Sequence, residues 1–156
     1  QPTLLTPGIG ITGPIPRINP VEVTDTAFFL DAHSKHPDPI DDDQAMWFDT
    51  QDGLVVLLGC CHAGLFNTLN YVRTITGIDR IRGIIGGMHL LYADEDQQID
   101  ACNRLFELGI DFIIPCHCTG EAATAMLRET LGADVVWSGM AGRVFNLGGV
   151  RQNEKP

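Results

Sequence analysis

Three apolar runs of this chain end at glycine or proline, and each is followed by a histidine. The histidines are His62, His89 and His117. An apolar run that ends in this way is typical of a buried strand, and its histidine then lies at the edge of a sheet, where α/β proteins build their sites. Imidazole is also the commonest metal ligand near neutral pH. The pattern therefore predicts a sheet with a metal site where its strands end.

Along the chain, segments whose apolar residues recur at helical spacing alternate with short apolar runs that are typical of strands. Residues 45–48 and 54–58 flank an Asp-Gly pair and predict a hairpin. Helical spacing predicts a helix over 94–108, with an inward face made of Ile99, Cys102, Leu105 and Phe106. We expect further helices from Leu65 to Gly77 and over 119–131, and strands at 26–30, 81–85, 112–114, 135–137 and 143–147. The order β-β-α-β-α-β-α-β-β indicates a layered α/β fold.

The length of 156 residues indicates one domain with a sizeable core. Residues 1–20 are rich in proline, glycine and threonine, which excludes a helix and a central strand, so we expect an extended arm or loop. The body of the domain covers residues 21–150. Residues 151–156 form a polar tail, where fraying is common.

Composition excludes several classes of function. The net charge of −10 disfavours nucleic-acid binding, and no apolar run is long enough to cross a bilayer. The start at Gln1 lacks a secretory signal and suggests a processed or truncated terminus. The 5 cysteines do not resemble a disulfide framework, which favours a cytoplasmic location. Cys60 and Cys102 are interpreted as small core residues, although thiols near histidines also bind metals.

Four short motifs carry a resemblance to a known family. They are DDQA at 42–45, GCCHAG at 59–64, IGGMHL at 85–90 and CHCTG at 116–120. Together they resemble the second half of a metallo-β-lactamase-fold hydrolase, over most of the chain. The most similar branch is the ribofuranosyl-aminobenzene 5'-phosphate (dihydropterin) synthase-like proteins. Cys61 stands where this branch has serine.

The resemblance implies a half or truncated αββα sandwich: a mixed sheet with helices on one face and a metal site at its rim. It implies that His62 and His117 are metal ligands. His89 lies where many members carry a bridging aspartate, so it is either a ligand or a substrate contact. The complete enzyme would hold one or two zinc ions, and this chain would hold them partly or not at all.

Three further residues are candidates for supporting the ligands or contacting substrate. Asp43 could orient a ligand, or it could simply belong to a turn. Thr119 could do the same, or it could cap the helix that follows. Gly87 could let the backbone approach a metal or substrate closely, or it could relax a tight turn. No catalytic residue is assigned.

One family motif is missing from the chain. Members carry His-x-His-x-Asp-His early in the sequence, whereas residues 33–38, HSKHPD, have the wrong spacing and indicate a solvated loop. The prediction is therefore a metal-dependent hydrolase present as a C-terminal fragment that is weakly active or inactive alone. One alternative is a non-catalytic metal- or ligand-binding module. The other is a redox domain that uses Cys116 and Cys118.

Partners follow from the same interpretation. We expect a small-molecule substrate, phosphorylated or not, and neither nucleic acid nor membrane. Helices can cover only one face of the predicted sheet. The arm could cover part of the other face but has too few large apolar groups to cover all of it. We therefore expect a homodimer, or pairing with the missing half of the sandwich.

Overall fold

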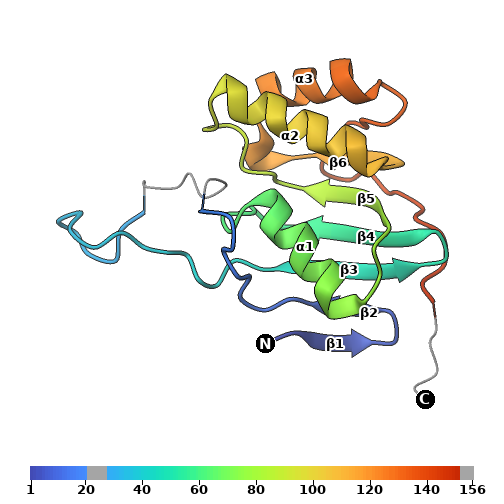
Figure 1. The fold of residues 1–156 in the computed structure, drawn as a ribbon, viewed down its shortest axis with the longest axis horizontal. Helices are drawn as coiled ribbons and strands as arrows, with labels where there is room; N and C mark the ends of the chain where they lie inside the picture. The colour runs from blue at the N-terminus through green and yellow to red at the C-terminus, as the bar shows by residue number, and fades with distance from the viewer. Residues whose placement is uncertain (21–27, 152–156) are drawn as a thin grey trace.

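Residues 1–20 and 28–151, which a computed structural model describes, form one mixed sheet with three helices on one of its faces (Figure 1). The strands are β1 (Thr3–Thr6), β2 (Ile9–Ile11), β3 (Ala45–Thr50), β4 (Gly53–Leu58), β5 (Ile81–Gly86) and β6 (Phe112–Pro115). The helices are α1 (Leu65–Thr76), α2 (Glu95–Leu108) and α3 (Glu121–Leu131). None of the helices described is long and apolar enough to span a membrane.

The strands lie in the sheet in the order in which they follow one another in the chain. The first four pair antiparallel, whereas β4, β5 and β6 pair parallel. The carboxyl ends of these parallel strands therefore meet at one edge of the sheet. The mixed α/β sheet with helices on one face confirms the predicted class of fold.

The hairpin of β3 and β4 is confirmed. It pairs Ala45 with Leu58 at one end and Thr50 with Gly53 at the other, around a two-residue loop. The Thr50 hydroxyl donates to the Gly53 carbonyl at 2.6 Å and closes the turn. Gly53 has a φ of 125°, which an L side chain rarely adopts, so the glycine suits this position.

Local sequence explains where the helices begin and end. Gly77, in the left-handed conformation, ends α1 as predicted. Asp94 begins α2 with a capping box, because its carboxylate accepts from the Gln97 amide and the Gln97 side chain accepts from the Asp94 amide. The buried face of α2 consists of Ala101, Cys102 and Leu105. Cys102 and Leu105 were expected to face inward, and they do. Ile99 and Phe106 were also expected to face inward, but they are 43% and 64% exposed.

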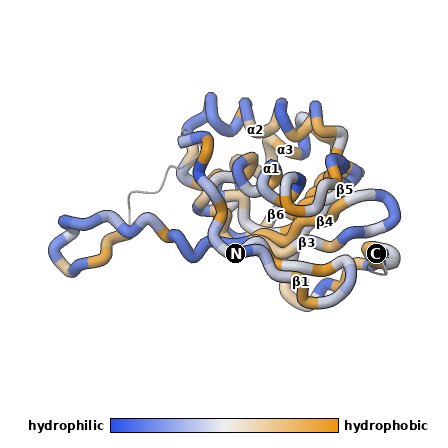
Figure 2. Tube along the Cα trace, turned by 60° about the horizontal axis from the view of Figure 1, so that its bottom comes forward, coloured by the Kyte–Doolittle hydropathy of each residue, from blue (hydrophilic) through white to orange (hydrophobic). Residues whose placement is uncertain are grey.

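The two faces of the sheet are covered differently (Figure 2). The helix side carries the main core, to which β4 contributes Leu54, Val56 and Leu58. On the opposite side a smaller cluster gathers Val55, Phe112 and Ile114 beneath residues of the segment that follows α3. The Trp137 ring stacks on the Phe112 ring with centroids 4.9 Å apart. This segment, and not the N-terminal arm, covers part of the second face.

The N-terminal arm differs from the loop that we expected. Its residues form β1 and β2, and β2 pairs with β3 from Ile9 opposite Phe48 to Ile11 opposite Met46. No proline falls within either strand, because Pro7 and Pro14 lie in the connections on either side of β2. The sheet is therefore extended at the antiparallel edge, and the element order is β-β-β-β-α-β-α-β-α.

The predicted closing strands are wrong as strands. Val136 forms only an isolated bridge with Ile113, and residues 143–147 form no strand. Glycines at 139, 142, 148 and 149 interrupt this part of the chain too often for a regular ladder. The strand expected at 26–30 lies partly outside the described residues, and within them Phe29 makes one isolated bridge with Pro37.

Candidate metal centre

Three loops meet at the edge where the parallel strands end. The loop after β4 carries His62, the loop after β5 carries His89, and the short 3₁₀ turn after β6 (His117–Thr119) carries His117. Parallel pairing of β4 with β5 and of β5 with β6 brings these loops together. The strand-end histidines thus gather at one edge because of the topology of the sheet.

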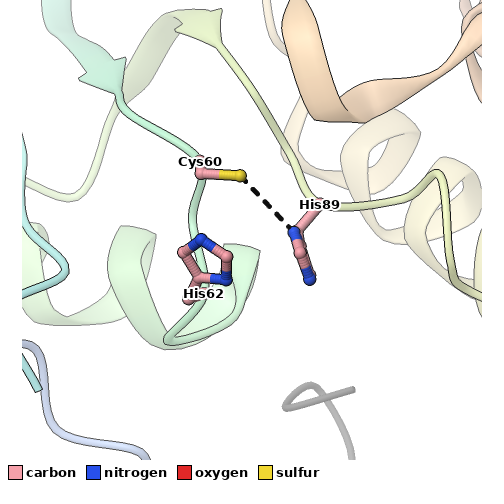
Figure 3. A group of neighbouring side chains, drawn as sticks. All are labelled: Cys60, His62 and His89. Carbon is pink, nitrogen blue, oxygen red and sulfur yellow. Dashed lines mark hydrogen bonds between the residues drawn. The ribbon is translucent and has the colours of Figure 1, made fainter. Parts of the chain in front are cut away.

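Cys60, His62 and His89 form one compact group. One ligand atom of each lies within 4.8 Å of those of the other two. The Cys60 Sγ is 3.6 Å from His89 Nδ1, and the rings of His62 and His89 have centroids 4.5 Å apart. Figure 3 shows the thiol directed at the His89 ring, with the His62 ring beside both. Neutral imidazole and thiolate are donors that zinc accepts, so these residues fit a metal ion.

His117 belongs to a second group, with Cys60 and Cys118, whose ligand atoms also lie within 4.8 Å of one another. The structure therefore brings His62 and His89 together directly, and it places His117 with them through Cys60, which both groups share. His117 is exposed, whereas His89 is 8% exposed. The assignment of the three histidines as ligands stays a prediction.

The expectation that Cys60 is a core residue is wrong. Cys60 is half-buried and directed at His89, because it follows β4 at the site edge, two residues before His62. That position in the strand-end motif was the signal that pointed to a site. Cys102, in contrast, is buried in the main core as expected, and burial raises the pKa of its thiol.

Left-handed backbone recurs in these loops. Cys61, His89 and His117 have φ of 65°, 53° and 47°, and none of them is glycine. Each such residue costs about 1–2 kcal/mol relative to ordinary backbone. Conformations of this kind persist where surrounding contacts impose them, and they cluster at functional sites. The three loops are therefore held in place by specific contacts.

Asp43 supplies one of these contacts. Its carboxylate accepts a hydrogen bond of 2.7 Å from the backbone N–H of Ala63, the residue after His62. Its own backbone N–H bonds to the Ile40 carbonyl at 3.2 Å, so it also closes a turn. Asp43 therefore belongs to a turn and holds the loop of His62, but it belongs to neither ligand group, and its role in orienting a ligand stays a prediction.

Thr119 does not cap α3, because the helix begins at Glu121 and Gly120 is its N-cap. The Thr119 side chain is buried, and its hydroxyl accepts a hydrogen bond of 3.1 Å from the backbone N–H of Met88. It therefore joins the loop of His117 to the loop of His89.

Replacing Thr119 by valine is expected to destabilise the protein by about 1–3 kcal/mol, because the buried Met88 N–H would lose its acceptor. Urea unfolding followed by circular dichroism measures this change. Thr74→Val is the matched control, since the exposed Thr74 hydroxyl only donates within its own helix, to the Asn70 carbonyl. Equal effects of the two substitutions would show that Thr119 does not join the loops.

Gly87 permits close packing of the loops. Its N–H donates to the Gly59 carbonyl at 3.0 Å. A Cβ at position 87 would lie 2.6 Å from Cys118 Sγ and 2.7 Å from the Gly59 oxygen. The glycine thus lets the loop after β5 contact the other two loops, rather than merely relaxing a turn.

His33 and His36 lie on an exposed loop, as interpreted from sequence. The Asp31 carboxylate organises this loop by accepting from the backbone N–H groups of His33, Lys35 and His36. Among the residues described, neither histidine belongs to a group that could hold a metal.

Comparison with solved structures identifies the fold. The chain superposes on the crystal structure of Tm1679, a metal-dependent hydrolase of the β-lactamase superfamily, with a TM-score of 0.83 and 28% identity. The alignment covers 95% of this chain and 57% of that one. The chain belongs to the metallo-β-lactamase superfamily.

Two proteins of Methanocaldococcus jannaschii are similar in sequence to this superfamily member. One is a 7,8-dihydropterin-6-methyl-4-(beta-D-ribofuranosyl)-aminobenzene-5'-phosphate synthase, 32% identical over 97 residues, which are 62% of this chain and 33% of that protein. The other is an uncharacterized protein that is 26% identical over 129 residues, which are 83% of this chain and 47% of that protein. The chain thus spans a third to a half of these relatives. No family model matches it.

Proposed function

We propose that this chain is part of a metal-dependent hydrolase in which His62, His89 and His117 hold zinc. The observation that carries the proposal is the convergence of the three strand-end loops in the fold of a metal-dependent hydrolase. A bound zinc ion would supply Lewis-acid chemistry and activate water near neutral pH.

The chain's own residues would position the ligands. Asp43 holds the backbone beside His62 through the Ala63 amide, and Thr119 ties the loops of His89 and His117 together. These hydrogen bonds hold the backbone of the ligand loops, and loss of contacts that orient metal ligands typically lowers metal affinity about 10–100-fold. Gly87 keeps the loops in contact at the edge where a substrate would approach.

The chain alone is proposed to be weakly active or inactive. Zinc takes about four ligands in proteins, and the histidines present supply three. The relatives are also much longer than the region that matches this chain. The proposed substrate is a small molecule, phosphorylated or not, and the proposed location is the cytoplasm. The name of one relative contains a 5'-phosphate, which favours a phosphorylated substrate.

The second candidate is a non-catalytic metal- or ligand-binding module. The length of the match favours this module, since the alignment covers 57% of the similar hydrolase chain. One relative in sequence is named a synthase, which makes a bond-forming reaction a further candidate.

Zinc analysis together with phosphodiesterase and lactonase assays on the purified chain tests these proposals. We expect little turnover, and we expect a chelator or the substitution His117→Ala to abolish whatever is measured. His36→Ala is the matched control, because His36 is exposed and belongs to neither ligand group. Zinc binding without any turnover would favour the module. Robust turnover at full zinc occupancy would show that the chain is self-sufficient.

Self-association through the second face of the sheet is also proposed. The segment after α3 covers only part of this face, and Leu57 of β4 remains 36% exposed. We expect a two-fold dimer, or pairing with a further part of the sandwich, since isologous dimers are the commonest closed assembly. Light scattering measures the mass, with Leu57→Asp as the variant expected to dissociate a dimer. A stable monomer at high concentration that binds no hydrophobic dye would contradict the proposal.

A further inference from the structure

Two thiols lie among the histidines and are not used by the proposed function. The Cys60 Sγ lies within 4.8 Å of a ligand atom of each member of both groups. These members are His62 and His89 in the first group, and His117 and Cys118 in the second. Cys118 is buried beside Cys60, and its Sγ donates to the Cys60 carbonyl at 3.1 Å. The loops therefore bring sulfur and nitrogen donors together.

The spacing of these donors matches that of metal ligands. Zinc bonds of about 2.3 Å to sulfur and about 2.0 Å to nitrogen, at a tetrahedral angle, place the two donor atoms about 3.5 Å apart. Cys60 Sγ and His89 Nδ1 are 3.6 Å apart. A thiol and an imidazole at this separation can therefore bind one ion after the thiol loses its proton, with little movement.

The neighbouring cysteine provides a contrast. Cys116 and Cys118 flank the same histidine, but their side chains lie on opposite sides of the chain. Cys116 packs against the cluster on the second face of the sheet, and its Sγ donates to the Ile114 carbonyl at 3.5 Å. Only Cys118 belongs to a ligand group.

We propose that the site is a mixed thiolate and imidazole centre in which Cys60 is the ligand common to both groups and Cys118 is a second sulfur ligand. This inference rests on the proposed function, since it adds ligands to the same metal site. Thiolate and imidazole donors select borderline and soft ions such as Zn²⁺, Co²⁺ and Cd²⁺ over the hard ions Mg²⁺ and Ca²⁺. Around one zinc ion, Cys60 supplies the fourth ligand that the three imidazoles lack, and Cys118 is a fifth donor beside it.

Cobalt provides a direct readout of sulfur ligation. The full chain, kept reduced with a phosphine rather than a thiol, is titrated with Co²⁺ and its absorption is recorded. We expect a strong sulfur-to-cobalt charge-transfer band in the near ultraviolet. Cys60→Ser should reduce this band more than Cys118→Ser, because Cys60 serves both groups, and the double substitution should abolish it. Cys116→Ser, the matched control, should leave it unchanged.

A second measurement needs no substitution. Alkylation mapped by mass spectrometry, with and without Zn²⁺, should show that zinc protects Cys60 and Cys118 but not Cys116. Cobalt that binds with ligand-field bands and without a charge-transfer band, together with unprotected thiols, would overturn this inference and leave a histidine site intact. Failure of the chain to bind Co²⁺ or Zn²⁺ at all would overturn the proposed function as well.

Discussion

Replacing Gly87 by alanine is expected to destabilise the folded chain by about 1–3 kcal/mol or more, because overpacking a close contact forces backbone to move. The added Cβ would lie 2.7 Å from the Gly59 oxygen and 2.6 Å from the Cys118 sulfur. The loops after β4, β5 and β6 would have to separate, so metal binding should weaken together with stability. Chemical unfolding with and without Zn²⁺ measures both effects.

Gly59→Ala is the matched control for this substitution. Gly59 lies at the same edge of the sheet, but a Cβ there would have no atom within 4 Å. We expect a change in unfolding free energy of less than about 0.5 kcal/mol, as at ordinary surface positions. If Gly87→Ala were as well tolerated as Gly59→Ala, the close packing of the loops could not be what positions the site.

Replacing His62 by alanine is expected to lower the affinity for Zn²⁺ by about 100-fold. The free energy of zinc binding at a four-ligand site is about 10–16 kcal/mol, which is about 3 kcal/mol for each ligand. A change of about 1.4 kcal/mol in binding free energy corresponds to a factor of ten in affinity. Competition with a fluorescent chelator measures the dissociation constant. His33→Ala controls for loss of a histidine, because His33 is exposed on the loop that Asp31 organises.

Two outcomes of the His62 experiment have different meanings. Unchanged affinity in His62→Ala would remove this histidine from the ligand set. Equal losses in His62→Ala and His33→Ala would indicate non-specific binding of zinc by exposed imidazoles. Circular dichroism of each variant separates a loss of ligand from a loss of fold.

The strands and helices near the site were predictable because their signals are local. An apolar run closed by glycine or proline marks β4, β5 and β6, and Gly77 and Gly109 mark the ends of α1 and α2. The edges of the sheet were not predictable in this way. β2 has three residues and pairs with β3, which begins more than thirty residues later in the chain, so no short sequence window contains the pairing.

The gathering of the three histidines at one edge was predictable, and their role as ligands stays a prediction, whereas the place of Cys60 beside them was not predictable. Strand ends placed His62, His89 and His117 at one edge, since parallel strands share an edge. The role of Thr119 depends on its distance from Met88, a residue from another loop. The place of Cys60 depends on which way its side chain leaves the end of β4. Neither is a property of sequence spacing, so helix capping and core packing were the better local interpretations.

The sequential order of the strands has a consequence for local opening. β1 is the free edge of the sheet, and all four of its residues are exposed. Its backbone amides should exchange with solvent first, followed by those of β2. The candidate ligands lie in the loops after β4, β5 and β6, so the first two strands can open while these loops stay together. Opening of β1 and β2 is thus separated by β3 from the strands whose loops carry the candidate ligands.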